Sequence, residues 1–177
     1  FSAVPVSQIP DLCQRLLASD ALSSQILLFL VLTAVRSGEA RGARWEEIDL
    51  AGSRWTIPAD RKKERRSMAV PLSAPSIQIL KSRLVFSDGE YVFGIKPLSD
   101  TAVSKQLKRH AGNYTVHGLR SSFRQWAAET TQYPEHVLEK ALGHSSESHL
   151  VDAYQRSDLF EQRRDVMEAW ANYCLSE

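Results

Sequence analysis

Apolar residues recur at intervals of three and four along most of the chain, the spacing that places them on one face of an α-helix. This pattern predicts helices over residues 6–19, 21–35, 39–44, 73–84, 99–111, 117–130, 134–143 and 158–175. The second of them is apolar around most of its circumference, as is typical of a helix buried on all sides. We therefore expect it to cross the centre of the molecule and to deliver Arg36 at its end, with Ser37 capping the next helix.

The hydrophobic period changes between the third and fourth predicted helices. Runs rich in β-branched and aromatic residues appear there at 45–50, 54–57 and 68–72, and such runs bounded by turns are typical of β-strands. A basic stretch, residues 61–66, is expected to form the turn between the last two strands, with Lys63 reaching outward. The pattern thus predicts an α+β fold that is mainly α-helical, with a small three-stranded antiparallel sheet.

Composition sets broad limits on the class of protein. The length of 177 residues fits one domain spanning residues 1–177, and the chain opens at Phe1, as expected for a domain taken from a longer protein. Lys and Arg number 22 against 21 Asp and Glu, a balance that does not by itself indicate a nucleic-acid-binding protein. The longest apolar run, residues 26–35, is too short to span a membrane, and no signal peptide precedes it. These observations favour a cytoplasmic protein without a membrane segment.

Two arginines and a tyrosine are candidates for chemistry on a phosphodiester. A phosphodiester under attack carries negative charge on its non-bridging oxygens, which a guanidinium can hold with two parallel hydrogen bonds. Arg36 and Arg120 are the candidates for this role. The hydroxyl of Tyr154 is the candidate nucleophile, but a phenol with a pKa of ~10 attacks poorly until another group accepts its proton.

Two histidines and a lysine can supply the proton transfers. His117 lies three residues before Arg120 and hence on the same face of a helix. His117 and His144 can exchange a proton near neutral pH and can donate a hydrogen bond to the phosphate. The departing 5′ oxygen of DNA also needs a proton, and Lys63 on the basic turn is the candidate donor.

Two basic groups are candidates for contact with the DNA backbone. The predicted turn contributes Arg61, Lys62, Arg65 and Arg66. One side of the 99–111 helix contributes Lys105, Lys108 and Arg109. Either group can instead be a solvated surface, which is the more common fate of a single charged run.

Other kinds of site are poorly supported. Neither of the closer histidine pairs, 110 with 117 and 144 with 149, has the helical spacing and nearby acid of a catalytic zinc site. The two cysteines lie at opposite ends of the chain. No glycine-rich phosphate loop follows a strand, and no Gly-x-Ser-x-Gly elbow is present. We therefore expect no metal and no cofactor.

Several segments, in a fixed order, carry a resemblance to a known family. Residues 32–39 (LTAVRSGE) with 43–50 (ARWEEIDL) resemble the first arginine box of the tyrosine recombinases, and His117-Gly-Leu-Arg120 resembles the second. Leu142-Gly-His144 resembles the segment that carries the family's second histidine, and Ala153-Tyr154 resembles its tyrosine box. The chain is similar to the C-terminal catalytic domain of prophage and genomic-island integrases related to those of satellite phages.

The resemblance implies an activity and a role for each candidate residue. It implies site-specific recombination in which Tyr154 forms a 3′-phosphotyrosyl link, with the two arginines and the two histidines around the phosphate. The family's catalytic lysine lies seven residues before the valine of Val-Pro-Leu, here Val70, and that position is Lys63 rather than Lys62. Because the energy of the broken bond is kept in the ester, neither ATP nor a metal is implied.

The resemblance also implies partners. These are double-stranded attachment-site DNA, three further copies of the enzyme in a tetramer on that DNA, and accessory DNA-bending proteins, at the bacterial nucleoid; the isolated domain is expected to be a monomer. The N-terminal arm-binding and core-binding domains of such integrases have no counterpart in these residues. Two alternatives stay open: nicking and closing like a type IB topoisomerase, and a DNA-binding module or regulator without strand transfer.

Overall fold

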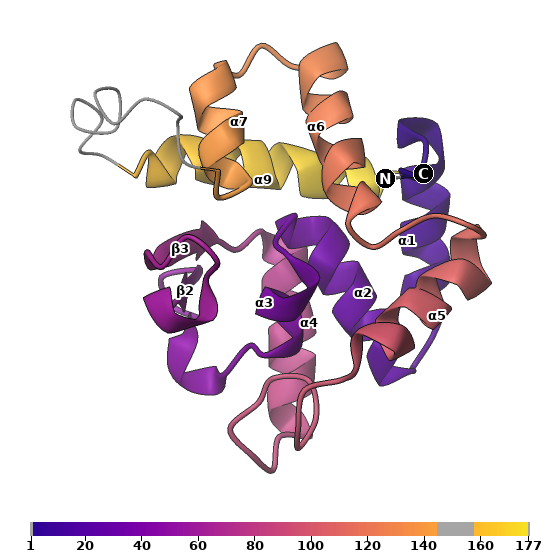
Figure 1. The fold of residues 1–177 in the computed structure, drawn as a ribbon, viewed down its shortest axis with the longest axis vertical. Helices are drawn as coiled ribbons and strands as arrows, with labels where there is room; N and C mark the ends of the chain where they lie inside the picture. The colour runs from indigo at the N-terminus through magenta and orange to yellow at the C-terminus, as the bar shows by residue number, and fades with distance from the viewer. Residues whose placement is uncertain (1, 145–157, 177) are drawn as a thin grey trace.

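The computed structural model describes residues 2–144 and 158–176. Helices predominate, and a small sheet lies at one side (Figure 1). The helices are α1 (Ile9–Leu17), α2 (Leu22–Thr33), α3 (Ser37–Arg41), α4 (Ala74–Val85), α5 (Asp100–Ala111), α6 (Gly118–Thr130), α7 (Glu135–Ala141) and α9 (Phe160–Cys174). The strands are β1 (Ile48–Asp49), β2 (Arg54–Ile57) and β3 (Met68–Pro71), and short 3₁₀-helices occur at Val6–Gln8, Trp45–Glu47 and Ala59–Arg61. The predicted α+β fold class is confirmed.

Helix α2 crosses the centre of the molecule. Every residue from Ile26 to Thr33 is buried, and α1, α4, α5 and α9 pack against the helix from several sides (Figure 1). The prediction of a central helix is therefore confirmed, but the helix ends two residues before the predicted end at residue 35. Ala34 adopts a left-handed conformation with φ of 51°, which stops the helix at Thr33. Arg36 consequently lies in an extended segment beyond the helix.

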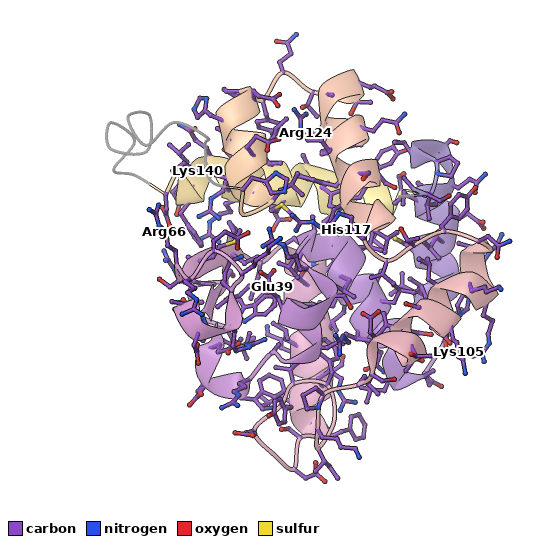
Figure 2. The ribbon with its side chains drawn as sticks, viewed as in Figure 1. Glu39, Arg66, Lys105, His117, Arg124 and Lys140 are labelled. Atoms are coloured by element: carbon purple, nitrogen blue, oxygen red, sulfur yellow. The ribbon has the colours of Figure 1, made fainter. Side chains whose placement is uncertain are left out.

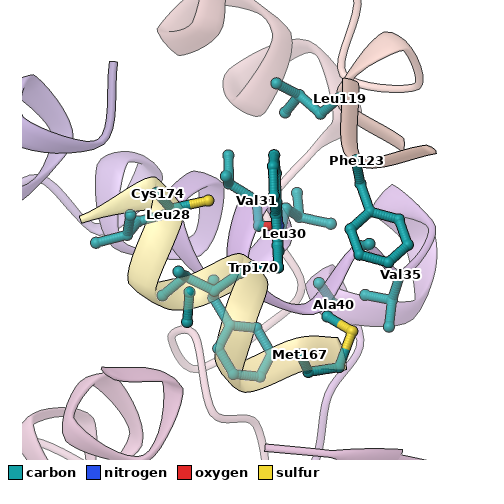
Figure 3. Close-up of a cluster of buried hydrophobic side chains, with 14 of the residues drawn as sticks. Leu28, Leu30, Val31, Val35, Ala40, Leu119, Phe123, Met167, Trp170 and Cys174 are labelled. Atoms are coloured by element: carbon teal, nitrogen blue, oxygen red, sulfur yellow. The ribbon is translucent and has the colours of Figure 1, made fainter. Parts of the chain in front are cut away.

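An aromatic cluster joins α9 to α2 and α6. The indole nitrogen of Trp170 on α9 donates a hydrogen bond to the carbonyl of Val31 at 2.7 Å. Its ring centroid lies 5.5 Å from that of Phe123 and 5.0 Å from that of Trp126, both on α6. Figure 3 shows Trp170 among apolar side chains of these helices. The last helix therefore packs within its own domain.

The sheet has β2 in the middle, with β1 and β3 antiparallel to it, as predicted. In its register Trp55 faces Val70 across the β2–β3 pair. The first strand is shorter than predicted because Trp45–Glu47 forms a 3₁₀-helix. The buried carboxylate of Glu47 accepts a hydrogen bond from the indole nitrogen of Trp55 at 2.9 Å, which fixes this helix against β2.

Within residues 2–144 and 158–176, no helix is long and apolar enough to cross a membrane.

Candidate active site

Arg36 is held at the start of α3. Its backbone N–H donates to Oε2 of Glu39 at 2.9 Å, the kind of side-chain hydrogen bond that closes the end of a helix. The helix begins at Ser37, so the expectation that Ser37 caps a helix over 39–44 is wrong. Both terminal nitrogens of the Arg36 guanidinium donate to Glu64 on the basic turn, at 3.0 and 2.6 Å.

Glu39 also holds the basic turn in place. The ammonium of Lys62 donates to Oε1 of Glu39 at 2.7 Å and lies 3.3 Å from the sulfur of Met68. The Lys62 side chain is only 3% exposed, and a buried ammonium needs such a partner. Gly143 approaches the same lysine with φ of +67°, and a Cβ there would lie 3.1 Å from Nζ. The turn, α3 and the end of α7 therefore meet at Lys62.

Helix α6 turns Arg120 inward and leaves His117 exposed just before its first residue. The guanidinium of Arg120 is buried and donates to the carbonyls of Ala34 at 2.6 Å and Leu142 at 2.7 Å. These carbonyls follow α2 and α7. Arg120 thus ties the ends of two helices together.

His144 stands beside Arg120. Its Nε2 lies 3.2 Å from a terminal nitrogen of Arg120, and its Nδ1 lies 2.7 Å from Oε2 of Glu139. The other oxygen of Glu139 accepts a hydrogen bond from Arg124 at 3.0 Å. A carboxylate on Nδ1 fixes the orientation of an imidazole ring and leaves Nε2 facing the site.

The site lowers the pKa values of Arg120 and His117. Burial lowers the pKa of Arg120 to about 10, and the positive charge of Arg36 adds to this effect. Partial burial also lowers the pKa of His117, with further contributions from Arg120, Arg36 and His144. His117 is therefore mostly neutral at pH 7 and able to accept a proton. Because neighbouring positive charges help to lower the pKa of Arg120 and of His117, the site favours a bound anion.

Two hollows on the surface meet at His144. The first, of about 570 Å³, is lined by His117, Arg120 and Glu139 together with His144. The second, of about 460 Å³, is lined by Lys62, Glu64 and His144 and by further basic side chains: Arg54, Arg66, Lys140 and Arg163. Arg120, His117 and His144 thus line hollows that carry several cationic side chains, whereas Arg36 lines neither of them.

The structure brings together four of the six predicted residues: Arg36, His117, Arg120 and His144. Lys63 is exposed on the turn and lines neither of these hollows, whereas its neighbour Lys62 lines the second. Tyr154 lies outside the described residues.

Five of the seven candidate DNA-contact residues lie on two separate surfaces, whereas Lys62 is buried against Glu39 and is not exposed for contact with a DNA backbone. Arg65 and Arg66 on the turn are exposed, as are Lys105, Lys108 and Arg109 on α5. Figure 2 shows Lys105 on the outer side of α5, away from His117 and on the other side of the molecule from Arg66. Arg61 instead bonds the carboxylate of Glu47 and, at 2.5 Å, the carbonyl of Glu39. The side chain of Arg61 therefore supports the fold of the turn.

Sequence reasoning missed three acidic residues of the site: Glu39, Glu64 and Glu139. Each carries a signal of its own in the sequence. Glu39 lies three residues after Arg36, Glu64 interrupts the basic stretch, and Glu139 lies five residues before His144. Among the described residues, no three His, Cys, Asp or Glu side chains gather in a way that could hold a metal ion.

The fold matches that of solved DNA integrases. A lambda integrase dimer bound to a COC′ core site matches with a TM-score of 0.63 over 83% of this chain and 59% of that one, at 20% sequence identity. The model of the phage integrase family matches residues 4–159. The chain belongs to the phage integrase family.

Curated relatives are similar over almost the whole chain. The prophage integrase IntA of Escherichia coli (strain K12) is 37% identical over 175 residues, which cover 93% of this chain and 42% of that protein. The integrase of Enterobacteria phage P4 is 29% identical, with 98% of this chain and 45% of the relative covered. The chain therefore spans less than half the length of these relatives.

Proposed function

We propose that this chain is the catalytic domain of a tyrosine recombinase that cleaves and rejoins DNA strands to integrate or excise a mobile element. The observation that carries the proposal is the convergence of Arg36, Arg120, His117 and His144 on one cationic site. Membership of the phage integrase family supports the same activity.

The two arginines bind the non-bridging oxygens of the scissile phosphate. Arg36 presents both terminal nitrogens on one side, which is the fork that suits two phosphate oxygens. Arg120 is fixed by two backbone carbonyls, so its charge is already in place before DNA arrives. Binding by these cations neutralises the charge on the phosphate oxygens and makes the phosphorus more electrophilic.

In the cleavage step the hydroxyl oxygen of Tyr154 bonds to phosphorus, and the bond from phosphorus to the 5′ oxygen breaks. The neutral ring of His117 accepts the tyrosine proton, and His144 donates a hydrogen bond to the phosphate. Lys63 gives a proton to the departing 5′ oxygen. Rejoining runs the same steps in reverse with a 5′ hydroxyl of the partner strand, and the sequence of steps needs no cofactor.

The proposed partner is duplex DNA at attachment sites. The matched lambda integrase is bound to a core site as a dimer, and a further lambda structure is a tetramer on a Holliday junction. By analogy this protein acts as a tetramer on DNA. Accessory DNA-bending proteins are further proposed partners, which the resemblance to integrases implies. Arg65, Arg66 and Lys63 extend the cationic surface from the site, so they are the residues expected to contact the backbone next to the scissile phosphate.

A suicide duplex tests this proposal. A duplex nicked close to the scissile phosphate loses a short fragment after cleavage and traps protein on DNA, which a denaturing gel detects. The account predicts a covalent band from the wild-type protein and none from Tyr154→Phe, although both bind the duplex. Equal binding without a covalent band from either protein would favour the DNA-binding module. Relaxation of supercoiled DNA without exchange between two sites would favour the topoisomerase alternative.

A further inference from the structure

The phosphate seat of Arg36, by which we mean its two terminal guanidinium nitrogens, already binds a carboxylate of the chain itself. Nη1 of Arg36 donates to Oε2 of Glu64 at 3.0 Å, and Nη2 donates to Oε1 at 2.6 Å. Both side chains are about three-quarters buried, with 25% of Arg36 and 23% of Glu64 exposed. Two parallel hydrogen bonds of this kind match the geometry of a carboxylate and of a phosphate equally well.

Glu64 is held there as an anion. Burial opposes its ionisation, but hydrogen bonds from its own backbone N–H and from Arg36, with the charges of Arg36 and Lys62, hold the pKa of its carboxyl below the usual value. The ammonium of Lys62 lies 4.0 Å from Oε2. A phosphate that is to use both terminal nitrogens of Arg36 must therefore displace a charged competitor.

The second carboxylate at Arg36 has a different role. Glu39 is 5% exposed and bonds the backbone of Arg36 and the ammonium of Lys62, at 2.9 and 2.7 Å. Its contact with the Arg36 guanidinium is longer, at 3.4 Å. Glu39 is thus built into α3, whereas Glu64 lies on the turn between Ala59–Arg61 and β3, outside the paired strands. Glu64 can leave the arginine without breaking the β2–β3 pairing.

The same turn carries the groups that would draw it toward DNA. Lys63, Arg65 and Arg66 flank Glu64 and are exposed. A duplex offers a row of phosphates that these cations can bind while Glu64 is repelled from it. A free phosphate ion is a single phosphate group. It cannot bind several of these cations at once, and so it cannot hold the turn away from Arg36.

We infer that Glu64 is a specificity-determining residue, which fills the phosphate seat of Arg36 until a DNA backbone draws the 61–66 turn aside. This inference rests on the proposed function, because it assigns Arg36 to the scissile phosphate. It makes the site selective for a phosphodiester within a duplex over free phosphate, and it couples opening of the seat to movement of the turn that carries Lys63.

The test measures binding of inorganic phosphate to the chain at constant ionic strength, by calorimetry and by the NMR shift of the arginine Nε–H groups. Glu64→Gln keeps the shape of the side chain and removes its charge. It should bind phosphate about tenfold more tightly than wild type, because loss of the charge removes the stronger, charge-assisted hydrogen bonds. The gain should vanish in the double variant Glu64→Gln with Arg36→Gln.

Glu129→Gln is the matched control, since it removes one negative charge at an exposed residue of α6 that bonds Gln125. Its phosphate affinity should stay within about twofold of wild type. Equal affinity of wild type and Glu64→Gln, or an equal gain in Glu129→Gln, would overturn the inference.

The suicide-duplex assay, run on the same preparations, separates this inference from the proposed function. A covalent band together with unchanged phosphate affinity in Glu64→Gln would refute the role of Glu64 and leave the recombinase proposal intact. An Arg36-dependent gain without any covalent band would support Glu64 as the occupant of the seat and count against strand transfer.

Discussion

Arg120 has a structural role that can be measured apart from any reaction. Its buried guanidinium donates to the carbonyls of Ala34 and Leu142, and so links the chain after α2 to the chain after α7. Each hydrogen bond from a charged donor contributes about 1.5–3 kcal/mol. Part of this gain offsets the cost of burying the cation, a cost reflected in the lowered pKa of Arg120.

Arg120→Gln should therefore reduce the free energy of unfolding by about 3 kcal/mol. For a chain of this size the melting temperature should fall by roughly 6–12 °C. Urea denaturation followed by circular dichroism measures the first quantity, and a thermal scan measures the second. Arg124→Gln is the control, because Arg124 lies one turn further along α6 in partly exposed ion pairs with Glu135 and Glu139. It should cost less than about 1 kcal/mol.

A loss below about 1 kcal/mol for Arg120→Gln would refute this reasoning. It would mean that the two carbonyls find other partners and that the arginine is held only for its charge. If the larger loss is observed, inactivity of an Arg120 variant in strand cleavage cannot by itself establish contact with the phosphate. DNA cleavage by such variants should then be measured at a temperature where the variant is folded.

Three further predictions concern proton transfer and its support. Glu139→Gln should slow formation of the covalent DNA complex about tenfold or more while DNA binding is kept, because His144 loses the charged partner of its Nδ1; an unchanged rate in single-turnover gels would contradict this. The folded protein binds a proton on His117 less readily than the unfolded chain, so stability should fall as the pH drops below about 6.5. His117→Gln should flatten part of that fall in urea titrations from pH 7 to pH 5, and an identical slope would rule the assignment out. Lys63→Ala should slow cleavage of normal DNA but not of DNA with sulfur in place of the departing 5′ oxygen, because a thiolate leaves without a proton. Rescue of Lys62→Ala instead would assign the donor to Lys62.

Most of the fold could be predicted from the local pattern of apolar and turn-forming residues. Residues 21–35 are apolar around most of their circumference, a pattern that is typical of a helix buried through the centre of a small domain. The three strand segments were likewise predicted from composition and turns. The predicted boundaries are wrong where a local backbone conformation sets the end of an element. Ala34 ends α2 by adopting a left-handed φ, and Trp45–Glu47 forms a 3₁₀-helix in place of a strand. Neither the identity of Ala34 nor that of residues 45–47 predicts these backbone conformations.

The candidate site shows what spacing can and cannot predict. The spacing of His117 and Arg120 predicts that they share a helix face, and in the structure they lie on either side of the first residue of α6. The acids that hold the cations depend on contacts between distant segments. Glu64 reaches Arg36 across 28 residues and Glu39 reaches Lys62 across 23. Sequence periodicity carries no information about contacts of this range, so the run 61–66 predicts a basic turn but not the contact of its Glu64 with Arg36.

The measurement that tests the central claim most directly is the identity of the residue joined to DNA. The chain has 5 tyrosines, and Tyr173 already donates its hydroxyl to the carbonyl of Val6 at 2.9 Å. Protease digestion of the trapped complex, followed by mass spectrometry of the DNA-linked peptide, locates the bond. The account predicts a nucleotide adduct on Tyr154 with a free 5′ hydroxyl on the released strand. An adduct on another residue, or a 5′-linked strand, would contradict it.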